Sequence, residues 1–264
     1  MPLSPLAATY DQFILDLDGS VWIGDEPTPR AVEAVEALRD AGKQTAFATN
    51  DPRSGTEDYV ARLWKIGIRA SLRDVVTVGG ALQHLLADTR SGRTAFVIGT
   101  DALRRHVTEA GLKILNDTDL ASRAEVVVVG GTEDLVYEDL RVASLAARRG
   151  ADFLATARDP TYPQPDGLWP GTGAILAAVE VASGRTAEIV GKPQPQLLLT
   201  ALDRLGEGRT LVVGDRVDTD LAAAAAAGLD GALVLSGGTP REALNGFEPP
   251  PVAVTDTLAD LLLA

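Results

Sequence analysis

Residues 13–22 read Phe-Ile-Leu-Asp-Leu-Asp-Gly-Ser-Val-Trp. The apolar run 13–15 predicts a buried strand, and two acids, Asp16 and Asp18, follow at its carboxyl end. Gly19 then lets the chain turn away. Ligands of open α/β sheets bind outside the carboxyl ends of the strands. Because two carboxylates this close are costly without a cation between them, the stretch predicts a carboxylate nucleophile beside a metal ion.

Three more places along the chain carry reactive groups just after a predicted strand. These strands are predicted at 44–48, 188–190 and 210–213. The groups that follow them are Thr49 and Asn50, then Lys192, then Asp215 to Asp220. A single such junction says little, because Asp and Asn also serve as helix caps and turn residues. Four junctions in this chemical order indicate one functional site.

Strand and helix patterns alternate along the 264 residues, which is enough chain for two domains of ordinary size. We predict an α/β fold with a doubly wound, Rossmann-like parallel-sheet core and an inserted α/β cap domain. The core is predicted to comprise 1–77 and 188–264, and the cap 78–187. Within the cap, strands are predicted at 94–98, 125–129 and 152–155, and helices at 102–110, 137–149 and 172–182.

The composition restricts the class of protein. The chain has 24 basic and 37 acidic residues and a net charge of −13, without a basic cluster, so we expect no nucleic-acid partner. The absence of Cys excludes a disulfide scaffold, a thiolate metal site and a cysteine phosphatase. No stretch approaches the roughly 20 apolar residues of a membrane span. With no signal-peptide pattern at the start, we expect a cytoplasmic protein.

The four motifs, taken in order, resemble those of the haloacid dehalogenase (HAD) superfamily of phosphohydrolases. The resemblance extends from about residue 10 to about residue 253. The long stretch between the second and third motifs resembles the type IIA subclass, which has a large α/β cap. Members of that subclass include p-nitrophenyl phosphatases and phosphoglycolate, glycerol-phosphate and sugar-phosphate phosphatases. The resemblance implies Mg²⁺-dependent hydrolysis of small organic phosphate monoesters through an aspartyl-phosphate.

The resemblance also implies a role for each acid of the motifs. Asp16 would attack phosphorus, and Asp18 would protonate the leaving oxygen and then deprotonate water. Asp215 would complete the Mg²⁺ site with Asp16 and the backbone carbonyl of Asp18. Asp218 and Asp220 are expected either behind these ligands or at a helix N-cap, and Asp220 is our candidate for the position behind the ligands.

The remaining motif residues would bind the phosphoryl group. The Thr49 hydroxyl and the Asn50 backbone N–H would hold a phosphoryl oxygen, and Lys192 would pair with both the phosphoryl group and Asp16. Asp51 stands where relatives often have a second Asn. We expect its carboxylate to point away from the phosphate or to cap the helix that begins near Ser54.

In the cap, the segment 155–163 resembles the family's substrate-contacting loop, although Ala157 replaces an Asn that is frequent there. Arg158 and Asp159 are therefore candidate substrate-binding residues. Arg158 would meet a second anionic group of the substrate, or alternatively would face solvent. Its replacement by Ala is predicted to raise KM selectively for acidic substrates.

Other functions stay open at this point. A phosphomutase would return an isomeric phosphate without releasing inorganic phosphate. A receiver domain also combines strand-end acids with Thr and Lys, but it accepts a phosphoryl group as a signal. A third alternative is a binding protein without catalysis. A homodimer formed through the cap is a further expectation, because cap surfaces of the resembled subclass often mediate dimers.

Overall fold

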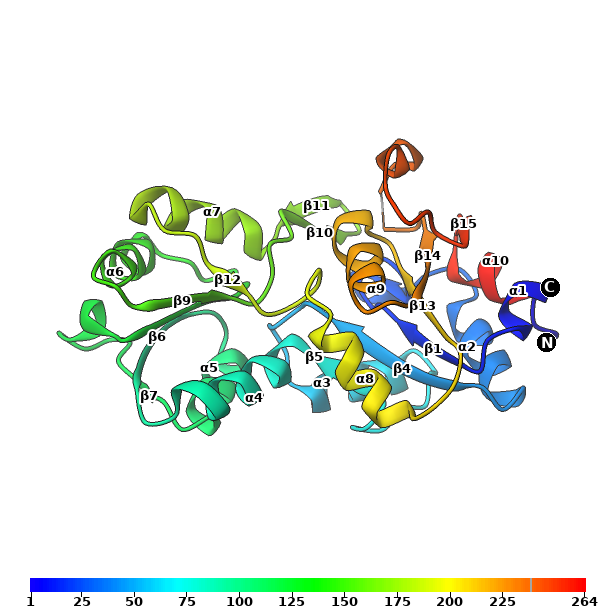
Figure 1. Ribbon diagram of the computed structural model, residues 1–264, viewed down its shortest axis with the longest axis horizontal. Coiled ribbons are helices and arrows are strands. Elements are labelled where there is room, and N and C mark those ends of the chain that lie inside the picture. Colours follow the sequence, from blue (N-terminus) through cyan, green and yellow to red (C-terminus); the bar gives the residue numbers. More distant parts are fainter. Residues whose placement is uncertain (238) are drawn as a thin grey trace.

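The computed structural model describes residues 1–237 and 239–264. Two parallel sheets lie at the two ends of an elongated molecule, and both termini lie at the core end (Figure 1). The core sheet has six strands in the order β15-β14-β13-β1-β4-β5. Its strands are β1 (Gln12–Leu15), β4 (Gln44–Thr49), β5 (Val75–Thr77), β13 (Thr210–Gly214), β14 (Asp230–Val234) and β15 (Ala253–Thr255). This architecture confirms the predicted α/β fold class.

Strand β1 lies near the middle of the core sheet and positions the site. It pairs in parallel with β13 on one side and with β4 on the other, so that Ile14 lies between Val212 and Ala46. All four residues of β1 are buried. Because the three strands run the same way, their carboxyl ends bring together the residues that follow them.

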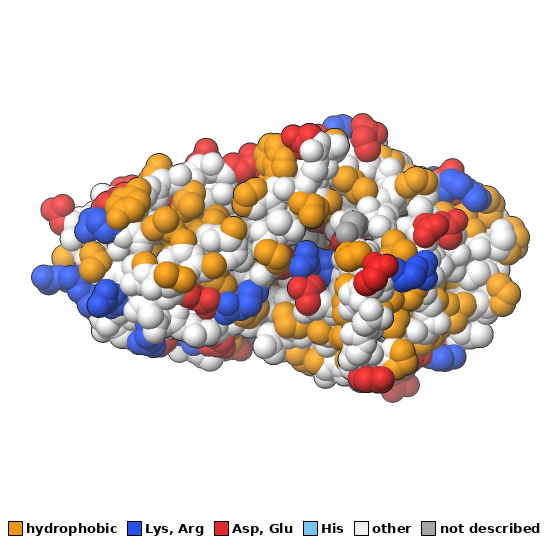
Figure 2. All heavy atoms as spheres, turned by 90° about the horizontal axis from the view of Figure 1, so that it is seen from above, with side chains coloured by type: hydrophobic (Ala, Val, Ile, Leu, Met, Phe, Trp, Pro, Cys, Tyr) orange, Lys and Arg blue, Asp and Glu red, His pale blue; other side chains and the backbone are white. Residues whose placement is uncertain are grey.

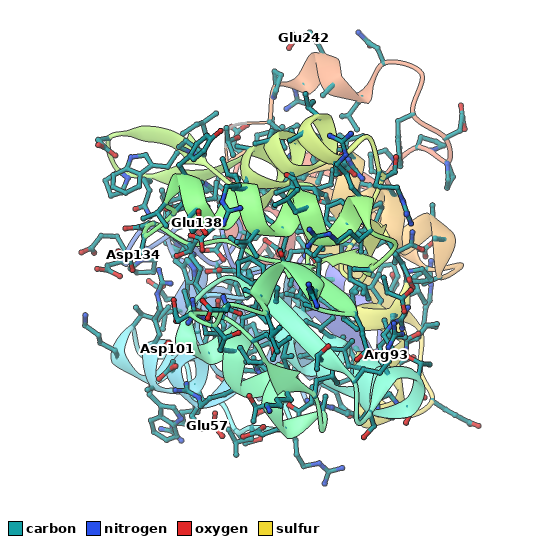
Figure 3. The ribbon with its side chains drawn as sticks, turned by 90° about the vertical axis from the view of Figure 1, so that its left-hand side faces the viewer. Glu57, Arg93, Asp101, Asp134, Glu138 and Glu242 are labelled. Atoms are coloured by element: carbon teal, nitrogen blue, oxygen red, sulfur yellow. The ribbon has the colours of Figure 1, made fainter. Side chains whose placement is uncertain are left out.

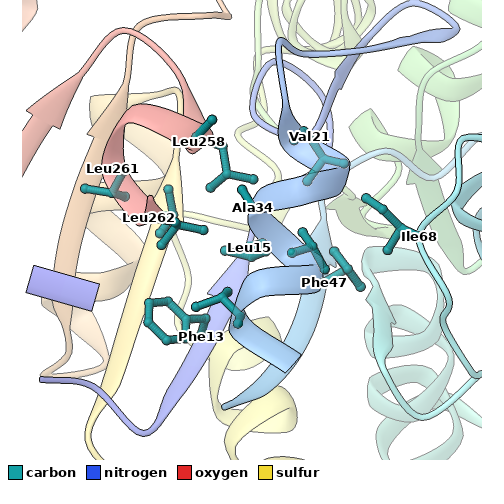
Figure 4. Packing of buried hydrophobic residues seen from close by; sticks show 14 of the residues in the cluster. Phe13, Leu15, Val21, Ala34, Phe47, Ile68, Leu258, Leu261 and Leu262 are labelled. Atoms are coloured by element: carbon teal, nitrogen blue, oxygen red, sulfur yellow. The ribbon is translucent and has the colours of Figure 1, made fainter. Parts of the chain in front are cut away.

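Helices cover both faces of the core sheet. One face packs on α2 (Ala31–Asp40), α3 (Thr56–Lys65) and α10 (Leu258–Leu262), and the other on α8 (Gln196–Leu205) and α9 (Ala222–Ala226). Phe13 and Leu15 point to the first face and Ile14 to the second, as the alternation of a strand requires. Figure 4 shows Phe13, Leu15 and Phe47 packed with Ala34 of α2 and Leu262 of α10.

The cap contains a second parallel sheet, in the order β12-β9-β8-β6-β7. Its strands are β6 (Thr94–Ile98), β7 (Lys113–Ile114), β8 (Val126–Val129), β9 (Asp152–Ala155) and β12 (Glu188–Ile189). Its helices are α4 (Val78–Arg90), α5 (Asp101–Glu109), α6 (Tyr137–Arg148) and α7 (Thr172–Ser183). A separate apolar cluster fills the space between this sheet and α6 and α7, so the cap has its own core.

The end of the cap differs slightly from the prediction. Glu188 and Ile189 pair with Leu154 and Ala155 of β9, so β12 belongs to the cap sheet and not to the core. The chain returns to the core only after this pairing ends, shortly before Lys192. We therefore propose that the cap comprises 78–189.

A hairpin that the sequence did not predict extends from the cap. Its strands, β10 (Thr161–Gln164) and β11 (Gly167–Pro170), pair antiparallel. Each strand contains a proline, and because proline usually argues against a strand, the sequence pattern gives no sign of this hairpin. In Figure 1 the hairpin reaches from α7 toward the core.

The remaining elements are short. They are α1 (Pro5–Ala8), the hairpin β2 (Trp22–Ile23) and β3 (Glu26–Pro27), the 3₁₀ helices Ala121–Arg123 and Arg241–Leu244, and the π-helix Val217–Leu221. None of the helices in the described part of the chain is both long enough and apolar enough to cross a bilayer.

The surface mixes charges. The face in Figure 2 shows scattered basic, acidic and apolar side chains without a broad basic area. Figure 3 looks onto the cap end and places the acidic Glu57, Asp101, Asp134 and Glu138 along one side, with Arg93 on the other.

Candidate active site

One cavity lies between the core and the cap, and the strand-end residues line it. It has about 740 Å³ of space, open solvent at its mouth included. The predicted site residues that line it are Asp16, Asp18, Thr49, Asn50, Asp159, Lys192, Asp215 and Asp220. The four junctions identified in the sequence therefore meet at a single place.

Lys192 lies at the centre of the buried charges. Its Nζ donates to Asp16 Oδ1 (2.5 Å), Asp220 Oδ1 (2.6 Å) and the Ala48 carbonyl (3.1 Å). Lys192, Asp16, Asp215 and Asp220 are all at most 8% exposed. Burial alone would lower the pKa of Lys192, but the charges of Asp16 and Asp220 outweigh it and raise that pKa. The two carboxylates therefore favour the charged form of the amine.

The acids around Lys192 can hold a divalent cation. Asp16, Asp215 and Asp220 each place one carboxylate oxygen within 4.8 Å of the others. Three carboxylates and one ammonium leave two negative charges, and burial raises the pKa values of Asp16 and Asp215. An all-oxygen, buried site with excess negative charge fits Mg²⁺.

Asp220 and Asp218 differ in their surroundings. The two oxygens of Asp220 accept from Lys192 Nζ (2.6 Å) and from the Arg216 backbone N–H (3.1 Å). With both oxygens engaged in this way, the position behind the residues that would hold the metal stays our prediction for Asp220. Asp218 is exposed and pairs with Arg216 NH2 at 3.0 Å. Asp218 therefore lies outside the cluster of buried acids.

Gly19, which follows β1, has to be glycine because Asp215 at the end of β13 lies directly against it. Its φ of +95° is in the left-handed region, and a Cβ at this residue would lie 2.5 Å from Asp215 Oδ2. A side chain here would displace the Asp215 carboxylate. The Asp-x-Asp-Gly order thus keeps the second strand end next to the first.

Asn50 has a role that the sequence did not reveal. Its side-chain Oδ1 accepts from the Lys192 backbone N–H (2.8 Å), and its Nδ2 donates to the Lys192 carbonyl (3.0 Å). The same Nδ2 donates to Asp159 Oδ2 in the cap (3.2 Å). The Asn50 side chain therefore fixes the backbone that carries Lys192, in addition to the expected role of its backbone N–H.

Asp18 lies beside Asp16 in a different environment. Its Oδ1 accepts from Trp22 Nε1 (2.9 Å), and the Trp22 ring is fully buried and stacks on Tyr59 with centroids 6.4 Å apart. Burial, and then the charge of Asp51, raise the pKa of Asp18. A raised pKa suits a group that must donate a proton. Nothing in the sequence distinguishes Trp22, as a hydrogen-bond donor, from an ordinary core residue.

The expectation for Asp51 was wrong in one respect. Its carboxylate lines the cavity, where it forms two bonds to Arg53, from Nε (2.8 Å) and NH2 (2.9 Å). The Arg53 guanidinium also lies 4.1 Å from the Tyr162 ring centroid and 3.5 Å from Glu133 of the cap. Arg53, which the sequence did not single out, therefore neutralises Asp51 and joins the core to the cap.

Of the two candidate substrate-binding residues in the cap, one lies in the wall of the cavity and the other lies outside it. Asp159 lines the cavity, accepts from Asn50, and lies 3.3 Å from Arg216 Nε. Arg158 does not line it, because its guanidinium turns outward and forms two 2.7 Å bonds to Glu180. This geometry contradicts the expected substrate contact of Arg158 and agrees with the solvent-facing alternative.

Replacing Lys192 with Met tests the balance of buried charge. Removing the ammonium leaves carboxylates uncompensated, so we expect a loss of about 3–5 kcal/mol in the free energy of unfolding at neutral pH. The pKa values of Asp16 and Asp215 are raised in the folded protein, so the fold gains stability when these groups are protonated. The loss should therefore be larger at pH 8 than at pH 5. Denaturant unfolding at both pH values measures it, and an equal loss at the two would contradict the charge account.

Comparisons with known proteins agree with this geometry. Residues 13–113 match the family model of haloacid dehalogenase-like hydrolases, and 189–261 match a second, HAD-hydrolase-like model. The D-glycerol 3-phosphate phosphatase of Mycobacterium tuberculosis is 36% identical over 236 residues, which cover 89% of this chain and 65% of that relative. This chain thus spans slightly less than two thirds of that relative's length.

Two further matches cover a larger share of the protein with which this chain is compared. The acid sugar phosphatase of Staphylococcus haemolyticus is 32% identical over 238 residues, which cover 89% of both chains. The crystal structure of glycerol phosphate phosphatase from Mycobacterium tuberculosis in complex with magnesium has a TM-score of 0.87 and 35% identity. That match covers 98% of this chain and 78% of the other.

Proposed function

This chain belongs to the haloacid dehalogenase-like hydrolase superfamily, in its type IIA subclass, and we propose that it hydrolyses small phosphate monoesters with the help of Mg²⁺. One observation carries the proposal. The buried Asp16 carboxylate accepts from the Lys192 ammonium and lies next to the Asp215 and Asp220 carboxylates, with a second acid, Asp18, two residues further on. This is an arrangement for nucleophilic attack on a phosphoryl group.

In the first step, Asp16 attacks phosphorus. A bond forms between its carboxylate oxygen and phosphorus as the ester bond to the leaving oxygen breaks. Asp18 donates its proton to that oxygen, so the alcohol leaves neutral. Lys192 and the Thr49 hydroxyl hold the phosphoryl oxygens and reduce the charge that repels the incoming carboxylate.

In the second step, water regenerates the enzyme. Asp18, now ionised, removes a proton from a water molecule that attacks phosphorus, and the Asp16 carboxylate leaves. Inorganic phosphate is the product. Asp16 and Asp215, with the Asp18 backbone carbonyl, would hold Mg²⁺, which supplies charge neutralisation and orientation of the phosphoryl group when bound. Asp220 keeps Lys192 in place beside them.

Removing the metal should stop turnover. We expect treatment with EDTA to lower the rate of phosphate release by at least about 100-fold, and added Mg²⁺ to restore it, because the site cannot neutralise phosphoryl charge with Lys192 alone. The measurement is inorganic phosphate released from glycerol 3-phosphate. Undiminished release in EDTA would contradict the metal site.

The substrate belongs to a range of small monoesters. The similar proteins named glycerol phosphate phosphatase and acid sugar phosphatase support glycerol phosphate and sugar phosphates as the first candidates. Phosphoglycolate, which bears a carboxylate, is the acidic ester to compare with them. A panel of these esters, scored by kcat/KM, ranks them. An isomeric phosphate without inorganic phosphate would favour the phosphomutase alternative, and a single stoichiometric phosphorylation would favour a phospho-acceptor.

We also propose a homodimer through the cap. The exposed apolar side chains of Tyr137 on α6 and Val181 on α7 support this surface, and the two helices pack side by side. Light scattering across a concentration series would test it. Cytoplasmic location stays a prediction, which cell fractionation would test.

A further inference from the structure

The two arginines in the cavity wall are already paired with acids. Arg53 bonds Asp51 through two nitrogens, at 2.8 and 2.9 Å, and lies 3.5 Å from Glu133. Arg216 lies 3.3 Å from Asp159 and 3.0 Å from Asp218. Each guanidinium therefore faces two carboxylates, and each group of three carries a net negative charge.

The third cation in the wall is also engaged. Lys192 lies between Asp16 and Asp220, at the place proposed above for the phosphoryl group. Among the described residues that line the cavity, these three are the cations, and Arg158 lies outside with Glu180. A substrate with a second anionic group would thus bring its charge to a wall in which every cation already meets two carboxylates. Burying an unpaired carboxylate is costly.

The same wall suits hydroxyl groups. The carboxylates of Asp51, Glu133 and Asp159 are acceptors, and hydroxyls of threonine supply both donors and acceptors. The threonines that line this part of the cavity are Thr132, Thr161 and Thr172. An alcohol leaving group with several hydroxyls can therefore donate to carboxylates that would repel another carboxylate.

Glu133 is placed to make this discrimination. Its Oε1 accepts from the Tyr162 hydroxyl (3.1 Å) and faces Arg53, so the carboxylate is held at the cavity although 63% of the side chain is exposed. The next residue, Asp134, lies along the acidic side of the cap end (Figure 3). Glu133 therefore adds negative charge where the part of the substrate remote from phosphorus enters.

We propose that Glu133 and Asp51 are specificity-determining residues that exclude leaving groups bearing a carboxylate and favour neutral polyols. The proposal rests on the phosphatase function proposed above. It predicts that glycerol 3-phosphate is a better substrate than 3-phosphoglycerate, which differs by a carboxylate in place of a hydroxymethyl group. The loss of either acid should reduce the difference in kcat/KM between the two esters, because Arg53 then becomes available to the carboxylate of the substrate.

The test is the ratio of kcat/KM for 3-phosphoglycerate to that for glycerol 3-phosphate. We expect this ratio to rise about tenfold in Glu133→Gln and further in Glu133→Lys, since a charge at a partly exposed site is screened but still contributes. The double variant Asp51→Asn/Glu133→Gln should give a larger rise than Glu133→Gln. The matched control is Glu180→Gln, which frees an arginine outside the cavity and should leave the ratio unchanged.

The outcomes separate this inference from the function on which it rests. A wild-type enzyme that prefers 3-phosphoglycerate, or a ratio that does not change in Glu133→Gln and Glu133→Lys, would overturn the specificity proposal while phosphate release continues. No release of phosphate by the wild-type protein from either ester or from sugar phosphates would overturn the proposed function itself. A rise of the ratio in Glu180→Gln equal to that in Glu133→Gln would show a general charge effect and would also contradict the proposal.

Discussion

Replacing Asp16 with Asn should lower kcat for phosphate release by at least about 10⁴-fold, because the amide cannot act as the attacking group. The substitution keeps the size of the side chain, and Lys192 retains its 2.6 Å bond to Asp220, so the protein should remain folded. The measurement is steady-state release of inorganic phosphate at saturating Mg²⁺, together with a thermal unfolding curve that verifies the fold.

A matched control separates the nucleophile from a general effect of acid removal. Asp203 is an exposed acid on α8, away from the cavity lining, and Asp203→Asn should leave kcat within about twofold of the wild type. If Asp16→Asn kept a rate within about tenfold of the wild type, direct attack by water would replace the aspartyl-phosphate account.

Replacing Asp18 with Asn should affect substrates according to their leaving group. For glycerol 3-phosphate we expect a loss of about 10³-fold in kcat, because the alkoxide needs the proton that Asp18 supplies. An aryl phosphate such as p-nitrophenyl phosphate has a leaving group that needs no proton, so its first step should be nearly retained. Its second step still needs Asp18 to activate water.

The two steps can therefore be separated in this variant. With p-nitrophenyl phosphate, Asp18→Asn should release one equivalent of nitrophenolate rapidly and then stop or slow sharply. Stopped-flow absorbance measures the burst, and the Asp203→Asn variant, which should turn over steadily, is the control. Equal losses for the aryl and alkyl esters, without a burst, would contradict the acid–base role of Asp18.

The sequence predicted the inner part of the site because parallel strands determine it. Once Asp16, Thr49 and Asp215 are each placed after a strand, the common direction of β1, β4 and β13 brings them to one edge. Lys192 was predicted from its place in the motif order, although the strand before it, β12, belongs to the cap sheet. The functional order along the chain was thus more informative than the local strand assignment.

The outer part of the site could not be predicted, because it depends on where the cap lies. The bond from Asn50 to Asp159 joins residues 109 positions apart, and the contact of Arg53 with Tyr162 forms only when the β10–β11 hairpin lies against the core. Arg158 and Asp159 are neighbours in the sequence, yet Asp159 lines the cavity and Arg158 pairs with Glu180 outside it. The direction of each side chain follows from the course of the backbone after β9, which the sequence alone does not give.

The most direct test of the account is to locate the phosphoryl group on the protein. The Asp18→Asn variant is mixed with p-nitrophenyl phosphate and Mg²⁺, quenched in acid during the burst, digested and sequenced by mass spectrometry. We predict one phosphoryl group per chain, on Asp16 within the peptide that contains β1. A phosphoryl group on another residue, or turnover of the ester with no labelled protein at any time, would contradict the central claim that Asp16 is the nucleophile.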